Sequence, residues 1–264
     1  MEKLKFSKSR YGSQKNCLGQ YYYQYIEKRT VPNILWPGTL LGTATHLFIE
    51  ENLNSIVKEK DIKKLPLFEE TFFKCKKKET SNLNVTYRTP KGFNEGDVLK
   101  NNNLWIKDIL RFLFLYLPPG IKIFEEDVRE EVVIEKYEIT VNGIIDLQVK
   151  DEHKLWVFDF KTTKNPNSWM FVNWEKDSQS LSYLWLKRES NPLGFNYLIF
   201  DSENKMIFSN NIGFQERTNV ENNLTTLLKD FIKNHEQSID NKNWSPSVET
   251  CKWCSFKVLC PRKI

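Results

Sequence analysis

Apolar residues recur along this chain with two different spacings. A spacing of three to four residues, which gathers apolar side chains on one helix face, predicts helices at 13–29, 39–53, 103–117, 176–188 and 220–235. Alternating or continuous apolar runs rich in β-branched residues predict strands at 127–136, 137–149, 155–162, 195–200 and 205–213. This order of elements indicates an α/β core whose sheet carries helices on its faces, with additions at both ends of the chain.

A length of 264 residues is sufficient for one large domain with a substantial core. We expect a single domain over 1–264, with its core at about 39–215, a Lys-rich and weakly patterned insertion at about 54–100, and terminal segments at about 13–29 and 244–264. The most apolar stretch, 109–117, is interrupted by Arg111 and is too short to cross a membrane. The start of the chain also lacks the apolar run of a signal peptide, so we expect a cytoplasmic protein.

Two neighbouring predicted strands each carry an aspartate within an apolar run. The first contains the sequence GIID, which ends at Asp146, and the second contains VFDFK, with Asp159 and Lys161. Side chains two residues apart on a strand project from the same face, so Asp159 and Lys161 lie together. Pairing of the two strands can bring Asp146 close to both.

This grouping suits the hydrolysis of phosphodiester bonds. Carboxylate oxygens bind hard divalent cations such as Mg²⁺, and a bound cation lowers the pKa of its water and shields the charge of a phosphate. A nearby lysine can orient that water and stabilise the charge that develops in the transition state. A surface ion pair between Asp159 and Lys161 is the alternative, but the apolar strand around them favours a catalytic role.

The same residues resemble the core motif of the PD-(D/E)xK superfamily, in its RecB-like nuclease branch. Two further motifs of that branch occur in the expected order: Gly-x-x-x-His-x-x-x-Glu at 42–50, which contains His46, and Gln-x-x-x-Tyr at Gln179 and Tyr183. The resemblance covers residues 42–183. It implies a restriction-endonuclease-like fold, with a mixed central sheet flanked by helices.

The resemblance also implies roles for individual residues. The metal ligands would be His46, Asp146, Asp159 and the main-chain carbonyl of Phe160, and an imidazole among carboxylates suits Mn²⁺ as well as Mg²⁺. Gln179 and Tyr183 would support the catalytic Asp146, Asp159 and Lys161 or contact the DNA backbone. Taken alone, His46 and Tyr183 could equally be core residues, and Gln179 could be a solvated helix residue.

Five cysteines are distributed unevenly. Without an export signal, ligation of a metal or cluster is favoured over disulfides, and the single C-x₂-C pair near the end of the chain is half of what a zinc ribbon needs. A four-ligand site therefore requires a distant cysteine, for which Cys17 is the natural candidate and Cys75 the alternative. The thiols concerned are Cys17, Cys251, Cys254 and Cys260.

One early cysteine followed by a terminal C-x₂-C-x₅-C is similar to the iron–sulfur version of the RecB-like nucleases, found in the AddB type and in CRISPR-associated RecB-like exonucleases. The resemblance implies a 4Fe-4S cluster that joins the N- and C-terminal segments in a structural role. Leu18 follows Cys17 where the family often has proline. Zinc bound by the same four thiolates remains open.

Basic and aromatic residues alternate directly after the second aspartate strand. They suit single-stranded DNA, because bases stack on rings while cations follow the backbone, although such rings often cover a core instead. The residues are Lys164, Trp169, Phe171, Trp174 and Lys176. The lysines of 57–78 form a second candidate wall of a DNA channel or a solvated face, and the net charge of +5 is compatible with either.

Together these features predict a Mg²⁺- or Mn²⁺-dependent DNA exonuclease that acts on single-stranded DNA or DNA ends. The resemblance implies a part in DNA repair, recombination or CRISPR adaptation, with a helicase or CRISPR-adaptation protein as partner, since the sequence has no P-loop of its own. The alternative is a non-catalytic iron–sulfur subunit that binds DNA within a larger complex.

Overall fold

The computed structural model describes residues 1–59, 67–82, 84–91, 93–190, 192–240, 244, 251, 254–256 and 259–260. Within these residues the helices are α1 (Lys8–Asn16), α2 (Leu18–Tyr21), α3 (Pro37–Glu59), α4 (Phe68–Thr80), α5 (Glu95–Tyr116), α6 (Asn167–Met170), α7 (Ser178–Leu186) and α8 (Arg217–Asp240). A π-helix, η1 (Tyr22–Ile26), follows α2, and a 3-10 helix, η3 (Arg188–Ser190), follows α7. The strands are β1 (Glu2–Phe6), β2 (Asn33–Leu35), β3 (Val85–Tyr87), β4 (Ile121–Ile134), β5 (Tyr137–Lys150), β6 (Leu155–Thr163), β7 (Gly194–Asp201) and β8 (Met206–Ile212).

The central sheet mixes parallel and antiparallel pairing. In the described part of the chain it has six strands, in the order β1-β5-β6-β7-β8 with β4 also paired to β5. The β1–β5 and β6–β7 pairs are parallel, whereas β4–β5, β5–β6 and β7–β8 are antiparallel. A short separate sheet pairs β2 with β3. The predicted α/β fold with a mixed central sheet is confirmed.

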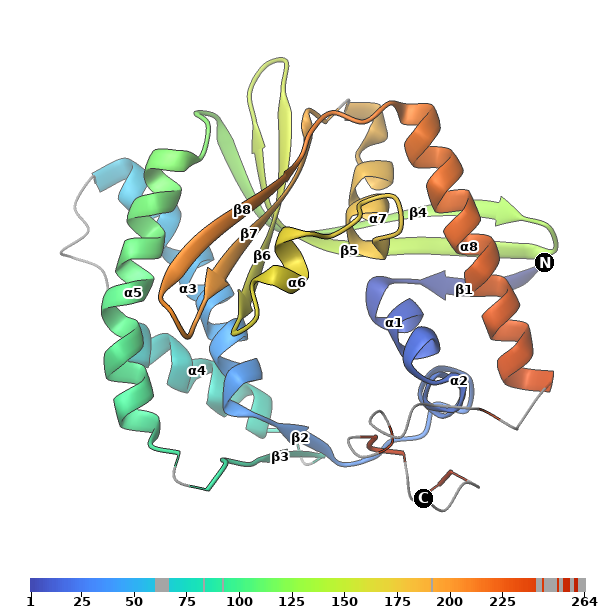
Figure 1. Ribbon diagram of the computed structural model, residues 1–264, viewed down its shortest axis with the longest axis horizontal. Helices are drawn as coiled ribbons and strands as arrows, with labels where there is room; N and C mark the ends of the chain where they lie inside the picture. The colour runs from blue at the N-terminus through green and yellow to red at the C-terminus, as the bar shows by residue number, and fades with distance from the viewer. Residues whose placement is uncertain are drawn as a thin grey trace.

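Strand β5 divides one of its edges between two partners. Along β5, β4 is paired from Tyr137 to Lys150, so β1 and β6 must share the opposite edge. There β1 pairs with 137–141 and β6 pairs with 147–150. Among the described residues, no strand covers that edge at 142–146, and Figure 1 shows β1 and β6 leaving β5 on either side of this stretch. We call residues 142–146 the gap of β5.

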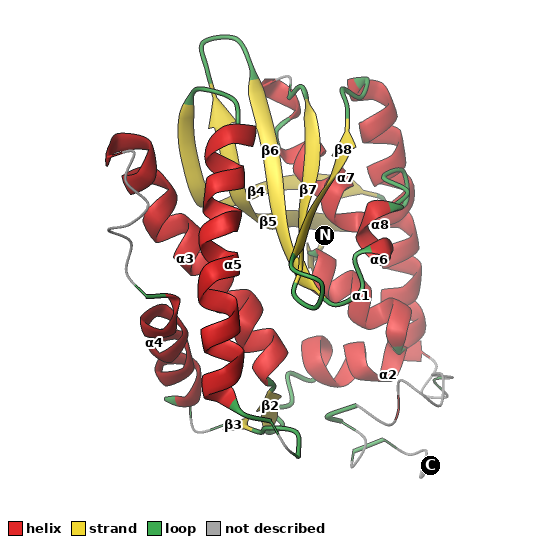
Figure 2. Ribbon diagram, turned by 60° about the vertical axis from the view of Figure 1, so that its left-hand side comes forward, coloured by secondary structure: helices red, strands yellow, loops and turns green. Residues whose placement is uncertain are grey.

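Helices cover both faces of the sheet (Figure 2). Helices α3, α4 and α5 lie on one face, and α1, α7 and α8 lie on the other. Each face has its own apolar core, and β6 contributes to both because its side chains alternate: Phe158 and Phe160 pack with α3, α4 and α5, whereas Val157 packs with α7 and α8. Asp159 and Lys161 share the parity of Val157, so they face the α7 side.

Most predicted elements occur close to their expected positions, but the prediction was wrong at the N-terminus. The expected helix at 13–29 begins earlier, at Lys8, because the Ser7 hydroxyl caps α1 by accepting from the Arg10 N–H. It is also interrupted at Cys17, whose extended backbone (φ −167°) separates α1 from α2. Strand β1 was not predicted, since a five-residue strand leaves little periodicity to detect.

The segment at 54–100 was described from the sequence only as a weakly patterned, Lys-rich insertion, and no element was assigned to it. It contains helix α4, which buries Phe68, Phe72 and Cys75 against α3 and α5. Its lysines had obscured this apolar face. Residues 60–66 of the predicted insertion lie outside the described residues. None of the helices in the described part of the chain combines the length and apolarity needed to span a bilayer.

Candidate active site

Asp146 is the last residue of the β5 gap, where its side chain takes the place of a strand partner. Its Oδ2 accepts a hydrogen bond from the Phe160 N–H at 2.7 Å. The paired register of β5 and β6 ends one step earlier, at Leu147 and Phe158, so Asp146 and Asp159 lie at neighbouring positions of adjacent strands. The strand pairing thus brings together the two aspartates, as predicted.

His46 reaches this position from α3 on the other face of the sheet. Its Nδ1 lies 3.6 Å from Asp146 Oδ2, and its ring packs edge-on against Phe160, with 5.7 Å between ring centroids. Burial lowers the pKa of His46, but the adjacent Asp146 carboxylate and the charge of Asp159 outweigh it and raise the pKa overall. Burial would raise the pKa of Asp146, but His46, Lys161 and the Phe160 N–H lower it.

Asp159 is the most buried charge of the centre, with 1% of its surface exposed. Lys161 forms an ion pair with its Oδ2, and the Gln179 amide donates to its Oδ1. Burial raises the pKa of Asp159 to about 6, with a further contribution from Asp146, although Lys161 opposes the shift. Because the Asp159 carboxyl group is buried next to a second carboxylate, binding of a cation beside it is favourable.

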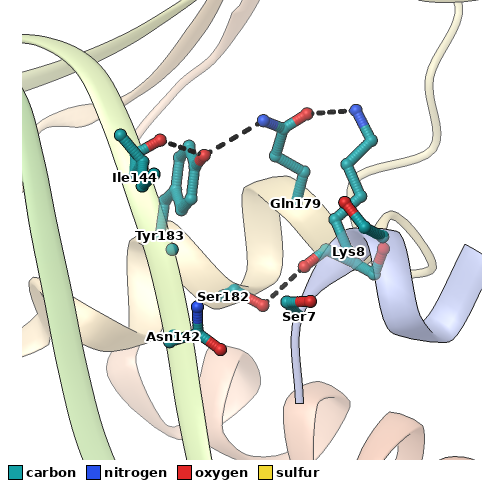
Figure 3. A pocket seen from close by; sticks show the side chains of 10 residues that line it. Ser7, Lys8, Asn142, Ile144, Gln179, Ser182 and Tyr183 are labelled. Carbon is teal, nitrogen blue, oxygen red and sulfur yellow. Dashed lines mark hydrogen bonds between the residues drawn. The ribbon is translucent and has the colours of Figure 1, made fainter. Parts of the chain in front are cut away.

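Helix α7 supplies the polar side chains that hold Asp159 in place. Gln179 donates from Nε2 to the Tyr183 hydroxyl at 3.1 Å, and that hydroxyl donates to the Ile144 carbonyl in the gap of β5. Figure 3 shows this chain of contacts from Ile144 through Tyr183 to Gln179. Both residues of the predicted Gln-x-x-x-Tyr motif therefore lie at the site, one turn apart on the same helix face.

Gly143 of the predicted GIID motif has a steric reason to be glycine. A Cβ atom at this position would lie 2.4 Å from the Tyr183 ring, which packs directly on the backbone of the gap. Gly143 and Tyr183 belong to different motifs of the sequence. The structure shows that one makes room for the other.

Lys8 is a residue of the site that the sequence analysis missed. Its Nζ donates to Gln179 Oε1 at 2.5 Å (Figure 3). The same Nζ lies 4.5 Å from the centroid of the Trp169 ring. Burial and the neighbouring Lys161 ammonium lower the pKa of Lys8 to about 8. Ser7, a helix-capping residue type directly before Lys8, was a sequence feature that could have placed the helix start, and hence Lys8, correctly.

The site lies within a chain whose sequence matches the PD-(D/E)XK nuclease superfamily model over residues 5–261. The chain belongs to the PD-(D/E)XK nuclease superfamily. A comparison with curated proteins gives no match. Among solved structures, one titled "Crystal structure of SSO0001" aligns at 14% sequence identity with a TM-score of 0.38, covering 94% of this chain and 95% of that chain.

Superfamily membership indicates a metal-dependent nuclease that acts on DNA with divalent ions such as Mg²⁺ or Mn²⁺. Within the described residues, no group of three or more His, Cys, Asp or Glu side chains is arranged closely enough to hold an ion. Asp159 is instead paired with Lys161, and Asp146 accepts from Phe160. The carboxylate oxygens and the imidazole are nevertheless the donor types that suit these ions.

The aromatic and basic residues predicted to contact DNA have different environments in this nuclease. Trp169 packs on Tyr197, with centroids 5.3 Å apart, and lies beneath the ammonium groups of both Lys8 and Lys161. Phe171 is 80% exposed, so its ring is free for other contacts. Lys164, Trp174 and Lys176 are exposed or half-buried around them.

A hollow of about 350 Å³ opens on the His46 side of the centre. Two lysines of α4, Lys74 and Lys78, line it together with His46 and Glu125. Glu125 has a left-handed backbone (φ 45°), which few residues other than glycine adopt. Two lysines of the predicted Lys-rich wall, Lys74 and Lys78, therefore reach the neighbourhood of the site.

Three of the predicted cluster cysteines lie within electrostatic range of the fourth, Cys254, although the four described thiols are not gathered closely enough to hold an ion. Burial raises the pKa of the Cys254 thiol, and the nearby thiols of Cys17, Cys251 and Cys260 raise it further. All four are free thiols. Cys75 is instead buried in the core beneath α3 and α5, which argues against it as the fourth ligand.

Aromatic packing brings the C-terminal segment to these cysteines. The Trp244 ring lies against Gly19, where a Cβ atom would be 2.5 Å from it, and packs on Tyr22 with centroids 5.2 Å apart. Tyr23 stacks on Phe256, and its hydroxyl donates to the Leu259 carbonyl at 2.7 Å. Residues from both ends of the chain thus meet next to α2.

Proposed function

We propose that this nuclease is a RecB-like DNA exonuclease that cleaves phosphodiester bonds at the gap of β5. The observation that carries the proposal is the buried Asp159, which contacts Lys161 and Gln179 and lies one strand away from Asp146. A buried carboxylate with a raised pKa beside a lysine and a second carboxylate is a typical arrangement of a catalytic site.

The metal ion implied by the superfamily fits the donors present. His46, Asp146, Asp159 and the Phe160 carbonyl would hold it, and the two aspartates are neighbouring carboxylates that a cation would relieve of mutual repulsion. When bound, the ion would lower the pKa of a water and polarise the scissile phosphate.

The protein's own side chains would share the remaining work. Lys161 lies beside Asp159, where its ammonium can orient the attacking water and neutralise charge that develops on the phosphate. Gln179 holds Asp159 in one orientation, and Tyr183 ties Gln179 to the backbone of the gap. Asp146 is held in the charged form by His46 and the Phe160 N–H.

We further propose that Cys17, Cys251, Cys254 and Cys260 hold a 4Fe-4S cluster with a structural role. The proximity of the four thiols and the aromatic packing of the C-terminal segment on α2 and η1 support this. A cluster there would close a loop of nearly the whole chain, which restricts the unfolded state strongly. Zinc bound by the same four thiolates is the alternative, and measuring the iron and zinc content of the protein distinguishes the two metals.

Exonuclease action, a role in DNA repair, recombination or CRISPR adaptation, and a helicase or adaptation-protein partner are part of the same proposal. They rest on the resemblance to RecB-like nucleases and on the sequence motifs at Asp146, Asp159, His46 and Gln179. Because the sequence lacks a P-loop, unwinding of duplex DNA would be the task of the partner.

The test compares linear and circular DNA as substrates for protein purified without oxygen, with Mg²⁺ or Mn²⁺. An exonuclease degrades linear single strands from their ends and leaves covalently closed circles intact. Cleavage of covalently closed circles would contradict exonuclease action and would still be consistent with nuclease activity. Asp159→Asn is the inactive control, and DNA binding without cleavage by the wild type would favour a non-catalytic DNA-binding subunit.

A further inference from the structure

A pocket of about 250 Å³ lies on the α7 side of the active site, and its walls come from the starts of α1 and α7 and from the gap of β5. Four serines, Ser7, Ser9, Ser178 and Ser182, line it together with Asn142 and Lys8. The residues that line the pocket include no carboxylate. Its volume is several times what one water molecule occupies, about 30 Å³.

The wall nearest to the catalytic residues is formed by Lys8 and Gln179 (Figure 3). Gln179 contacts the pocket on one side and donates to Asp159 on the other, so a group bound in the pocket would lie one side chain away from the proposed metal ligand. The pocket is therefore an extension of the active site along the strand gap.

Lys8 is a cation without an acidic partner. Among the described residues, no carboxylate lies within ion-pair distance of its ammonium, whereas the neighbouring Lys161 is paired with Asp159. The contacts of Lys8 are the neutral Gln179 amide and the Trp169 ring. A lysine donates up to three hydrogen bonds, so donors remain for a further ligand. Asp159 and Asp177 act on Lys8 from beyond ion-pair distance, but burial and the Lys161 ammonium outweigh them, so a further anion next to Lys8 is favoured.

We propose that this pocket binds a phosphate group of the DNA strand that is being cleaved, with Lys8 as the phosphate-binding residue. The ligand is an anion because one ammonium, serine hydroxyls and an amide offer donors, while the residues that line the pocket include no carboxylate. It is a phosphate of the substrate because the pocket adjoins Gln179 and Asp159. This inference rests on the proposed function, and it adds a contact that fixes how the strand lies across the site.

The contact also has a second consequence for Gln179. Lysine can only donate, so Lys8 fixes the Gln179 carbonyl oxygen toward itself and leaves the Gln179 NH₂ group to face Asp159. Substitution of Lys8 should therefore raise KM, because the contact with the strand phosphate is lost. It should also lower kcat, because Gln179 is no longer held in one orientation.

The test uses DNA binding without cleavage, so that it does not depend on catalysis. The dissociation constant of a single-stranded oligonucleotide is measured in EDTA at several salt concentrations for wild type, Lys8→Met, Lys8→Arg and Lys233→Met. Methionine keeps the side-chain length over Trp169 and removes the charge. Lys233 is an exposed lysine of α8 that does not line the pocket, so its variant is a control for net charge.

We expect Lys8→Met to weaken binding about tenfold and to reduce the salt dependence by about 0.7, the value for one single-strand phosphate contact. Lys8→Arg should restore most of the affinity, and Lys233→Met should bind like the wild type. Affinity and salt dependence of Lys8→Met equal to those of the wild type would overturn the inference. If Lys8→Met does not fold, the double variant Ser9→Ala/Ser178→Ala replaces it. This variant should weaken binding and leave the salt dependence unchanged, because no charge is removed, and wild-type affinity would overturn the inference.

Oligonucleotides with a 5′-phosphate and with a 5′-hydroxyl identify which phosphate is bound. If only the phosphorylated form loses affinity in Lys8→Met, the pocket takes a terminal phosphate; if both lose it equally, the pocket takes an internal one. Either result supports the inference. A wild type that binds DNA in this Lys8-dependent way but does not cleave it would contradict the proposed nuclease function and leave the pocket assigned.

Discussion

The acidic centre and the cysteine group both unite segments that are distant in the sequence, but they do so by different means. In the acidic centre, β5, β6 and α7 place Asp146, Asp159 and Gln179 through strand register and hydrogen bonds. In the cysteine group, the rings of Trp244 and Phe256 pack on α2 and η1 and bring the thiols near one another.

This difference suggests that the acidic centre serves catalysis, whereas the cysteine group serves the stability of the fold. The hydrogen bonds of the acidic centre fix individual atoms, so small changes there should affect catalysis most. Ring packing fixes segments rather than atoms, and a bound cluster would complete the geometry of the thiolates and contribute to folding. We therefore expect variants of the acidic centre to keep their iron content, and variants of the cysteine group to keep most of their cleavage rate.

The largest effect is expected from Lys161→Ala. Removing the ammonium beside Asp159 should lower the rate of DNA cleavage by about a hundredfold to a thousandfold, because charge on the phosphate loses its nearest donor. Single-turnover rates measured with Mn²⁺ test this. Lys154→Ala, in the exposed turn between β5 and β6, should cleave normally. Iron content should be the same in both variants, and loss of iron in Lys161→Ala would show that the two regions are coupled.

The next effect concerns the cysteine group. Cys254→Ser should lose bound iron, seen as loss of visible absorption, and lower the free energy of unfolding by about 2–5 kcal/mol, as removal of a native cross-link does. Cys75→Ala should keep its iron, because Cys75 lies in the core beneath α3 and α5. Below the melting temperature, Cys254→Ser should retain most of its cleavage rate. Full iron content in Cys254→Ser, or stoichiometric zinc in the wild type, would contradict the cluster assignment.

A smaller effect is expected from Gly143→Ala. The new methyl group would lie 2.4 Å from the Tyr183 ring, so the ring must shift, at a cost of about 1–3 kcal/mol. The shift also moves Gln179, and cleavage should slow. Gly12→Ala is a matched control, since a Cβ atom at Gly12 meets nothing within 4 Å. Combining Gly143→Ala with Tyr183→Ala should cost less than the sum of the two, and simple additivity would refute the proposed contact.

The smallest effect is a dependence of stability on pH in the absence of metal. The pKa of Asp159 is about 6 in the folded protein against an ordinary value of 3.8. Between these values the folded state binds more protons than the unfolded state, so the stability of the wild type falls as pH rises from about 4 to about 6. Asp159→Asn removes this loss.

The difference in melting temperature between Asp159→Asn and the wild type, measured in EDTA, should therefore grow over this window and stay constant above it. Asp151→Asn provides the comparison, because N–H groups of the following turn lower the pKa of Asp151 and place its effect at lower pH. If the difference in melting temperature between Asp159→Asn and the wild type did not change with pH, this would contradict burial as the cause of the raised pKa of Asp159.

Much of this protein could be predicted from its sequence. The spacing of apolar residues located most of the helices and strands of the core, and alternation along β6 correctly placed Asp159 and Lys161 on one face. The motifs at His46, Gln179 and Tyr183 pointed to residues that the structure does bring to Asp146 and Asp159. Local periodicity and short motifs depend on residues that are close in the sequence, so they can be recognised without knowledge of the tertiary structure.

Other features were decided by the tertiary structure. The gap of β5 exists because β1 and β6 divide one edge of a strand, and pairing across that distance leaves no local pattern. The same holds for Lys8, which meets Gln179 across 171 positions of sequence, and for Tyr183, whose ring requires a glycine at position 143. The sequence determined which side chains carry charge and on which face of each element they lie. Only the packing of distant elements decided which of them face one another, because that depends on contacts that no short segment contains.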